Sequence, residues 1–143
     1  MRVGRRVSVI GAAAGVTGGE QAAQFDPAHG TGLARLVRAS AQYPLIRDFS
    51  TTPSHYVEVQ PTGRLLGFNN SNRLVSSADW DIQLQKTGYI REAGRCLVML
   101  ANVASKPMII VLLDSWGKMT RIGDANRIKR WVESASLARP AAG

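Results

Sequence analysis

Two apolar segments separated by a short turn constrain the fold of this chain most. Residues 96–103 and 108–113 are mostly hydrophobic, and the turn sequence ASKP joins them. The continuous run 108–113 is typical of a strand in the centre of a sheet. Downstream, apolar residues recur at steps of three and four, which predicts a helix over about 120–135 with one apolar stripe packed on that sheet. The stripe consists of Ile122, Ala125, Ile128, Trp131, Val132 and Ala135, with Trp131 expected in the core.

Shorter patterns precede these segments. Residues 33–43 form a short amphipathic helix pattern that stops before Pro44, because the residue ahead of a proline is disfavoured in a helix. Residues 56–60 and 64–68 are expected to pair as a hairpin around the turn sequence PTG. A polar loop is then indicated by asparagines, with the alternative that they line a cleft as donors; they are Asn69, Asn70 and Asn72.

The strand expected next carries the chemistry. Ile82 and Leu84 alternate with Gln83 and Gln85, which predicts a half-buried strand, and the tetrapeptide Lys86-Thr87-Gly88-Tyr89 closes it. A lysine gives a positive field for an anionic substrate end, and a threonine gives a short hydroxyl donor. A glycine removes a side chain where a ligand must lie flat along the strand.

From about Leu33 to Glu133 the chain resembles the later part of the low-molecular-weight penicillin-binding proteins, the D-alanyl-D-alanine carboxypeptidases and endopeptidases. The matching pieces are LARLVRASAQYPLIRDFST, LLGFNNSNRLV, DWDIQLQKTGYIREAGRCLVMLA, PMIIVLLDSWGK and DANRIKRWVE. The resemblance implies an α+β fold: an incomplete β-lactamase-like or DD-peptidase-like domain whose antiparallel sheet is packed by a C-terminal helix. It is closest to the endopeptidase branch, although the motif does not separate endopeptidase from carboxypeptidase.

The resemblance also implies roles for individual residues. Lys86, Thr87 and Gly88 would bind the substrate, and the backbone N–H of Tyr89 would be one of two oxyanion donors. The expected partners are peptidoglycan peptide stems or cross-links, with β-lactams as ligands of intact relatives. Intact relatives are expected to be exported or periplasmic, and this chain shows no convincing signal peptide. No cofactor or metal is expected.

The nucleophile of that family is missing from the expected place. The family uses Ser-x-x-Lys on a helix, then Ser-x-Asn, then Lys-Thr-Gly, in that order. No Ser-x-x-Lys precedes Lys86, and no Ser-x-Asn occurs anywhere in the sequence. Ser115-Trp116-Gly117-Lys118 follows Lys86, and its glycine would weaken a helix, so we interpret it as a turn. We therefore expect a fragment of a serine-type peptidase that has no catalytic residue of its own and is inactive by itself.

Residues 1–32 are rich in glycine and alanine, match nothing in the family, and are expected to be disordered or not to be family sequence. Residues 33–134 are expected to form the C-terminal part of the domain, and 135–143 a disordered tail. Three interpretations of 1–32 remain open. Arg2, Arg5 and Arg6 ahead of an apolar stretch suggest an export signal. A strand over residues 7–10 followed by glycines is a weak signal of a nucleotide-binding turn. A shifted reading frame, a wrong start or a gene remnant is the third and preferred hypothesis.

Charge and cysteine content suggest two further expectations. The net charge is +8, which favours polyanions, but aromatic content is only 6% and there is no nucleic-acid-binding motif, so nucleic acid is not an expected partner. A non-catalytic cell-wall-peptide binding module is the main alternative function.

The single cysteine, Cys96, is expected to pack as a small buried hydrophobe. No apolar run is long enough to span a bilayer. A solvated helix face is expected for the basic cluster Lys118, Arg121, Arg127, Lys129 and Arg130.

Overall fold

The computed structural model describes residues 8–13, 27–115 and 117–138. Its elements follow the chain in this order: β1 (Ser8–Ala13), α1 (Pro27–Ser40), α2 (Pro44–Thr51), β2 (Ser54–Val59), β3 (Arg64–Asn69), the 3-10 helix η2 (Arg73–Ser76), β4 (Asp81–Ile90), β5 (Gly94–Val103), β6 (Lys106–Ser115) and α3 (Thr120–Leu137).

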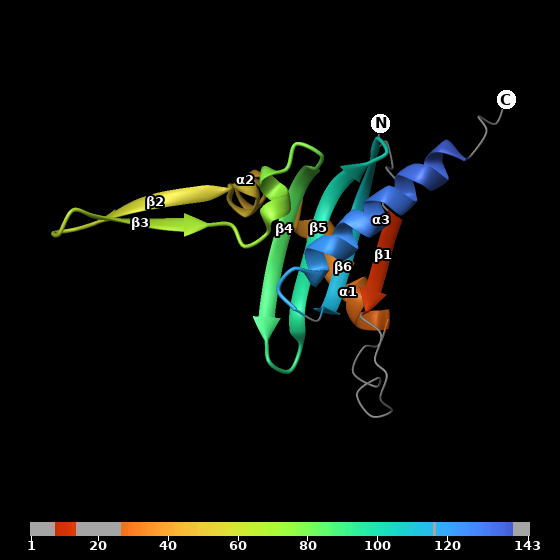
Figure 1. The fold of residues 1–143 in the computed structure, drawn as a ribbon, viewed down its shortest axis with the longest axis horizontal. Coiled ribbons are helices and arrows are strands. Elements are labelled where there is room, and N and C mark those ends of the chain that lie inside the picture. The colour runs from red at the N-terminus through yellow and green to blue at the C-terminus, as the bar shows by residue number, and fades with distance from the viewer. Residues whose placement is uncertain (1–7, 14–26, 116, 139–143) are drawn as a thin grey trace.

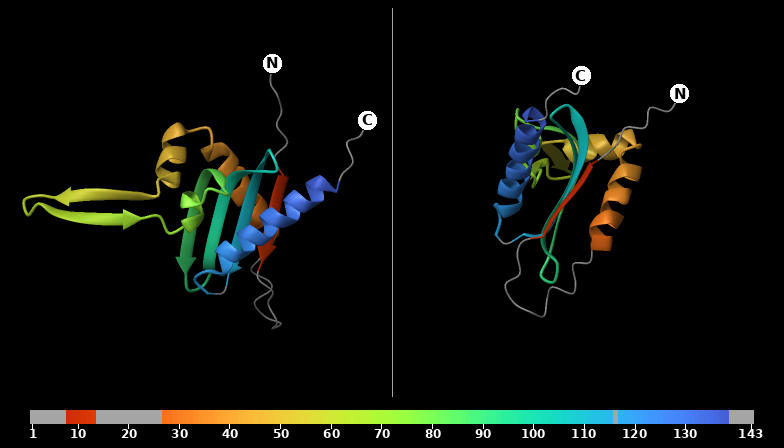
Figure 2. Two further views of the ribbon diagram at one scale, coloured as in Figure 1. Left: turned by 45° about the horizontal axis from the view of Figure 1, so that its top comes forward. Right: turned by 90° about the vertical axis from the view of Figure 1, so that its right-hand side faces the viewer.

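A four-stranded sheet lies between two helices. Its strand order is β1-β6-β5-β4; β6, β5 and β4 pair antiparallel with one another, and β1 runs parallel to β6. Figure 2 shows the sheet edge-on, with α3 on one face and α1 on the other. This confirms the α+β prediction of an antiparallel sheet packed by a C-terminal helix, and it adds a parallel strand and a second covering helix.

Alternate residues of the inner strands feed two separate cores. On the α3 face, Leu97 and Met99 of β5 pack with Ile110 of β6 and with Ala125 of α3. On the α1 face, Ile109 and Val111 pack with Ala34 and Val37 of α1. Because both faces are covered, β5 and β6 read as continuous apolar runs and not as alternating ones.

An irregularity near the start of β4 reverses which side chains face which core. The register with β5 shifts between Ile82 and Leu84. Ile82 packs on the α3 side, whereas Leu84 packs on the α1 side, although the two residues share sequence parity. Such a bulge inserts one extra residue and re-aims everything after it.

Gln85, expected on the polar face of this strand, is only 5% exposed. Its side-chain amide donates to the carbonyl oxygen of Ser50, at 2.6 Å, and to Oδ1 of Asn70, at 3.0 Å. These partners come from outside the strand, so the alternation of residue types could not reveal that Gln85 is enclosed.

The helices near the N-terminal side of the domain differ from the prediction. The helix expected over 33–43 spans Pro27–Ser40, so the predicted boundary after residue 32 falls inside it. A second helix, α2, begins at Pro44 itself, in the first turn, where a proline costs no hydrogen bond. The interpretations of residues 1–32 concern mostly residues outside the described part of the chain. Within it, residues 8–13 form β1 and residues 27–32 belong to α1, so the expected disorder was wrong for these residues. The predicted disordered tail 135–143 was wrong for residues 135–137, which continue α3 to Leu137, and residues 139–143 lie outside the described part.

Two predictions about packing were wrong. Trp131 is 64% exposed, because only Ile122, Ala125, Ile128 and Val132 of the predicted stripe contact the sheet. Ala135 is exposed as well. Cys96 is half-buried, since it lies at a second register shift, between Arg95 and Leu97, and its thiol donates to the carbonyl oxygen of Ala93.

The predicted hairpin forms and projects away from the sheet. Figure 1 shows β2 and β3 extending beyond α2, on the side of β4 away from β5. Every described side chain of the two strands is exposed except that of Leu66, which is half-buried. At the hairpin's base, the backbone N–H of Asn70 donates to the carbonyl oxygen of Pro53, at 2.8 Å. Among the described residues, no helix is long and apolar enough to cross a membrane.

Candidate functional site

The strand that carries Lys86-Thr87-Gly88 lies at the edge of the four-stranded sheet. β4 pairs with β5 on one side only. Its first half is covered on the other side by α2, through contacts with Gln83 and Gln85. From Lys86 to Ile90 no described strand pairs with that second side, and all of these residues except Thr87 are exposed. We call this stretch the open edge.

The backbone N–H groups that point toward the open edge can be identified from one hydrogen bond. The N–H of Gln85 donates outward, to Oγ of Ser50, at 3.3 Å. Along an antiparallel strand, N–H groups alternate between the two sides, and the register from Leu84 to Ile90 is continuous. The N–H groups of Thr87 and Tyr89 therefore face the open edge; the role of Tyr89 as an oxyanion donor stays a prediction.

The side chains of the tetrapeptide divide between the two faces of the sheet. Lys86 lies on the face of Leu84, and Thr87 and Tyr89 lie on the opposite face. Lys86 is exposed, and its ammonium group donates to the carbonyl oxygen of Thr87, one of the outward-facing acceptors. A flexible, exposed lysine next to the strand edge can exchange this carbonyl for an anionic ligand.

Gly88 has no internal reason to be glycine. A Cβ added to it would meet only Cβ of Cys96, at 4.0 Å, which is an ordinary contact. Its backbone φ is not among the positive values. The lack of a side chain therefore matters only to what lies outside the protein, against the open edge.

Ser71 is a neighbour of this motif that the sequence analysis did not identify. Its hydroxyl lies 2.6 Å from the hydroxyl of Thr87. The flanking asparagines have internal roles: Asn70 bonds to the carbonyl oxygens of Ser50 and Thr52, and the fully buried Asn72 accepts from the N–H of Leu74. The predicted polar loop is confirmed for Asn70 and Asn72, whereas Asn69 is the last residue of β3. No sequence signal pointed to Ser71, because the loop geometry that brings it to Thr87 is tertiary.

A buried arginine adds positive charge behind the strand end. Arg121, in the first turn of α3, is only 7% exposed, so the expectation that it belongs to a solvated face was wrong. It donates from Nη1 to the carbonyl oxygen of Cys96, at 3.5 Å, and among the described residues its Nε has no partner. Burial lowers the pKa of Arg121, and the charge of Arg95 lowers it further. Since arginine titrates so high, the guanidinium remains charged at neutral pH.

Arg121 and Arg95 both lie close to the open edge. Cys96, whose carbonyl Arg121 contacts, is the cross-strand partner of Gly88. The guanidinium of Arg95 stacks on the ring of Tyr89, 4.5 Å from its centroid. Two guanidinium groups at this end of the sheet, with no described carboxylate bonded to either, favour an anion nearby.

The sequence Ser115–Lys118 does not have helical geometry. Ser115 is the last residue of β6 and is 4% exposed. Gly117 has φ +78°, and α3 begins only at Thr120. This confirms the predicted turn for the residues described; Trp116 lies outside them. Within the described ranges, no group of three or more His, Cys, Asp or Glu side chains could hold a metal ion.

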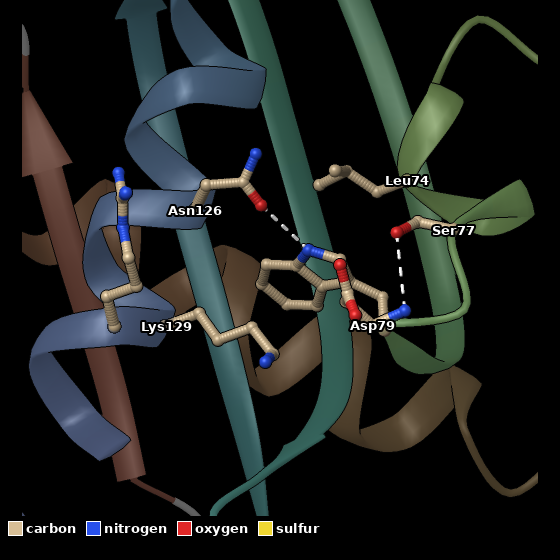
Figure 3. A pocket seen from close by; sticks show the side chains of 7 residues that line it. Leu74, Ser77, Asp79, Asn126 and Lys129 are labelled. Carbon is tan, nitrogen blue, oxygen red and sulfur yellow. Dashed lines mark hydrogen bonds between the residues drawn. The ribbon is translucent and has the colours of Figure 1, made fainter. Parts of the chain in front are cut away.

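A separate hollow of about 340 Å³ lies on the α3 face (Figure 3). The indole N–H of Trp80 donates to Oδ1 of Asn126, at 2.9 Å, and Lys129 pairs with Glu133. Trp80 precedes β4, so this hollow is on the order of 20 Å or more along the strand from Gly88. The hollow is not part of the open edge.

Comparison with known proteins places the site in context. The family model described as D-alanyl-D-alanine carboxypeptidase matches residues 14–117. The chain is 46% identical over 111 residues to a D-alanyl-D-alanine endopeptidase of Pseudomonas aeruginosa, covering 77% of this chain and 36% of that protein. It thus spans about a third of the length of the curated relatives that it matches.

Solved structures share the same fold. The Streptomyces K15 DD-transpeptidase superposes with a TM-score of 0.59 at 27% identity, covering 69% of this chain and 39% of that one. Penicillin-binding protein D2 from Listeria monocytogenes, solved in a cefotaxime-bound form, gives a TM-score of 0.50 at 24% identity, covering 65% of this chain and 35% of that one; this likeness shows the fold alone.

Proposed function

This chain belongs to the D-alanyl-D-alanine carboxypeptidase family, and we propose that it binds the carboxylate end of a D-alanyl-D-alanine peptide along the open edge of β4 without hydrolysing it. The observation that carries this proposal is the open edge itself. Backbone donors of Thr87 and Tyr89, the exposed ammonium group of Lys86 and an unhindered glycine lie together on a strand edge that no described strand pairs with.

An extended peptide can add to this edge as a further strand. Main-chain hydrogen bonds then supply affinity, and the side chains of the edge strand supply specificity. Gly88 lets the added strand approach closely. Lys86 attracts the terminal carboxylate, the hydroxyl of Thr87 donates to it, and the buried charge of Arg121 strengthens the positive field at that end of the sheet.

Catalysis would need groups that the printed sequence does not contain. An oxyanion needs two donors, and in this family the second is the amide of the nucleophilic serine. The N–H of Tyr89 alone would leave a deficit of about 10²–10³ in rate. Without a serine activated by a lysine one helical turn away, no acyl-enzyme forms. Ser115 is buried at the end of a strand and does not meet this requirement.

The setting that fits this function is the bacterial cell wall. Peptidoglycan stems and cross-links would be the ligands, and β-lactams, which mimic the same peptide end, would bind weakly and reversibly. We further propose that longer proteins of this type are exported to the periplasm and that the finer activity, endopeptidase or carboxypeptidase, is set by parts that this chain does not span.

Two measurements on the purified chain test the proposal. Incubation with a fluorescent penicillin should give no covalently labelled band, and titration with N-acetyl-D-alanyl-D-alanine should give a saturable heat or NMR shift signal. The C-terminal carboxamide of the same peptide should bind more weakly, because it lacks the charge that Lys86 attracts. Stable labelling of the intact chain would overturn the claim of inactivity, and absence of saturable binding would overturn the claim of recognition.

A further inference from the structure

The loop between β3 and η2 brings a second hydroxyl to the binding motif. Oγ of Ser71 and Oγ1 of Thr87 are 2.6 Å apart, across 16 positions of sequence. Ser71 is exposed, whereas Thr87 is half-buried. A serine on the surface ordinarily bonds to water, so this direct contact requires the loop to hold it in place.

The residues on both sides of Ser71 are anchored. The side chain of Asn70 donates to the carbonyl oxygens of Ser50 and Thr52, at 3.0 and 3.1 Å, and its Oδ1 accepts from the side chain of Gln85, at 3.0 Å. Asn72 is fully buried and accepts from the N–H of Leu74, at 3.2 Å. With its two neighbours fixed, Ser71 contacts Thr87 at little further cost in backbone entropy.

The hydroxyl pair has one hydrogen in excess. Each hydroxyl carries one donor hydrogen, and only one of the two lies between the oxygens. When Ser71 donates to Thr87, the hydrogen of Thr87 is left to donate to a ligand. Donors linked in this way polarise one another, so Thr87 becomes a stronger donor to an anion than it would be alone.

We propose that Ser71 is a positioning residue that holds the Thr87 hydroxyl ready to donate to a ligand carboxylate at the open edge. The inference rests on the proposed function, because it takes the carboxylate of a D-alanyl peptide as the acceptor. Ser71 acts through Thr87 and needs no contact of its own with the peptide.

The affinity of N-acetyl-D-alanyl-D-alanine for a set of variants tests this role. S71A should weaken binding by about 3- to 10-fold, the usual worth of one hydrogen bond, and S71T should restore it. In a T87V background the S71A substitution should have no further effect, because its target is gone. The carboxamide peptide should lose less affinity than the carboxylate in S71A. S76A, at an exposed serine in η2, is the matched control and should bind as the unsubstituted chain does.

A second readout needs no ligand. Three-bond NMR couplings of Thr87 should report one χ1 rotamer in the unsubstituted chain and averaging in S71A. If the peptide binds and S71A matches the unsubstituted chain, or if the losses from S71A and T87V simply add, the inference is wrong. If the unsubstituted chain does not bind the peptide, the proposed function fails, and an unchanged Thr87 rotamer in S71A then overturns the positioning role as well.

Discussion

At the scale of single residues, Arg121 is the side chain whose surroundings are least favourable to stability. Its guanidinium is buried, one of its nitrogens has no described partner, and Arg95 lies close enough to lower its pKa. A buried charge without a counter-ion costs free energy, and groups held in this way are candidates for a functional role. We infer that an anionic ligand compensates this charge when it is bound.

Replacing Arg121 with methionine should therefore separate stability from binding. R121M keeps the apolar stem and removes the charge, so the free energy of unfolding should rise by about 1–2 kcal/mol. Affinity for N-acetyl-D-alanyl-D-alanine should fall about tenfold. Urea denaturation and calorimetric titration measure the two effects. R127M, at an exposed arginine that pairs with Asp124, is the control and should change neither by much. A destabilised R121M that binds normally would contradict the interpretation.

Replacing Lys86 should change binding without changing stability, because its side chain is exposed. K86M should leave the melting temperature unchanged and weaken binding of the carboxylate peptide by about 10- to 100-fold, the worth of a charged hydrogen bond. The remaining affinity should depend less on salt concentration. Titration at low and high salt measures both effects. K106M, at the exposed lysine that begins β6, is the matched control, and an equal loss in K106M would mean that net charge alone drives binding.

At the scale of elements, the open edge of β4 results from two features that sequence patterns do not display. The register shift near Ile82 reverses the faces, and the cap formed by α2 and Asn70 closes the first half of its outer side. The second half remains open. The covered first half anchors the strand in the domain, and the second half leaves backbone groups unpaired, as the proposed binding of a peptide requires.

The turn that follows this strand depends on Gly94. Its φ is +64°, and an added Cβ would lie 2.3 Å from Oδ1 of Asp114 and 2.9 Å from its Cα. G94A should therefore lower the free energy of unfolding by about 2–4 kcal/mol, from backbone strain and overpacking together. Gly123 in α3 has nothing within 4 Å, so G123A should raise it by about 1 kcal/mol. Thermal melts followed by circular dichroism compare the two, and a tolerated G94A would show that the turn adapts.

The sequence predicted most elements of this domain, because their signals are local. The apolar runs of β5 and β6, the turn before Arg64 and the periodicity of α3 each depend on neighbours a few residues away. The Lys-Thr-Gly strand was predicted for the same reason. What the sequence could not show is set by distant residues. Gln85 is buried because Ser50 and Asn70 enclose it, and Trp131 is exposed because it lies beside the stripe of α3 residues that packs on the sheet.

The strand that carries the Lys-Thr-Gly motif was predicted, whereas the roles of its residues stay predictions. The motif and the direction of the Tyr89 N–H follow from strand alternation once the strand is recognised. Ser71 and Arg121 are brought to it by a loop and by a helix start, so they carried no signal of their own. The beginning of α2 at Pro44 was missed because a proline ends one helix and can equally begin another.

At the scale of the whole molecule, the hairpin of β2 and β3 stands apart from the layered domain (Figure 1). On one of its faces Val57 pairs with Leu66, and the flanking pairs on that face join Phe68 to His55 and Val59 to Arg64. Two isolated strands are marginally stable in water. The hydrogen bonds made by Asn70 therefore hold its base, while its far end depends on cross-strand contacts alone.

Amide hydrogen exchange should reveal this difference. Amides in β5 and β6, between two covered faces, should exchange at least about a hundredfold more slowly than those of β2 and β3, since the hairpin can open without unfolding the sheet. Exchange followed by mass spectrometry of peptides from the two regions measures the ratio. Equal protection would mean that the hairpin is packed against something in solution, which sedimentation at several concentrations would identify as a second copy or exclude.

Because helices cover both faces of the sheet, the chain tolerates little truncation. Stopping the chain after Ser115 would strip α3 and leave Leu97, Met99 and Ile110 facing water; starting it beyond Ser40 would do the same to the opposite side. Each helix covers one core, so deleting either one should abolish folding of the domain abruptly and not by degrees. Any shortened form intended to stay in solution has to retain the whole stretch from Pro27 to Leu137.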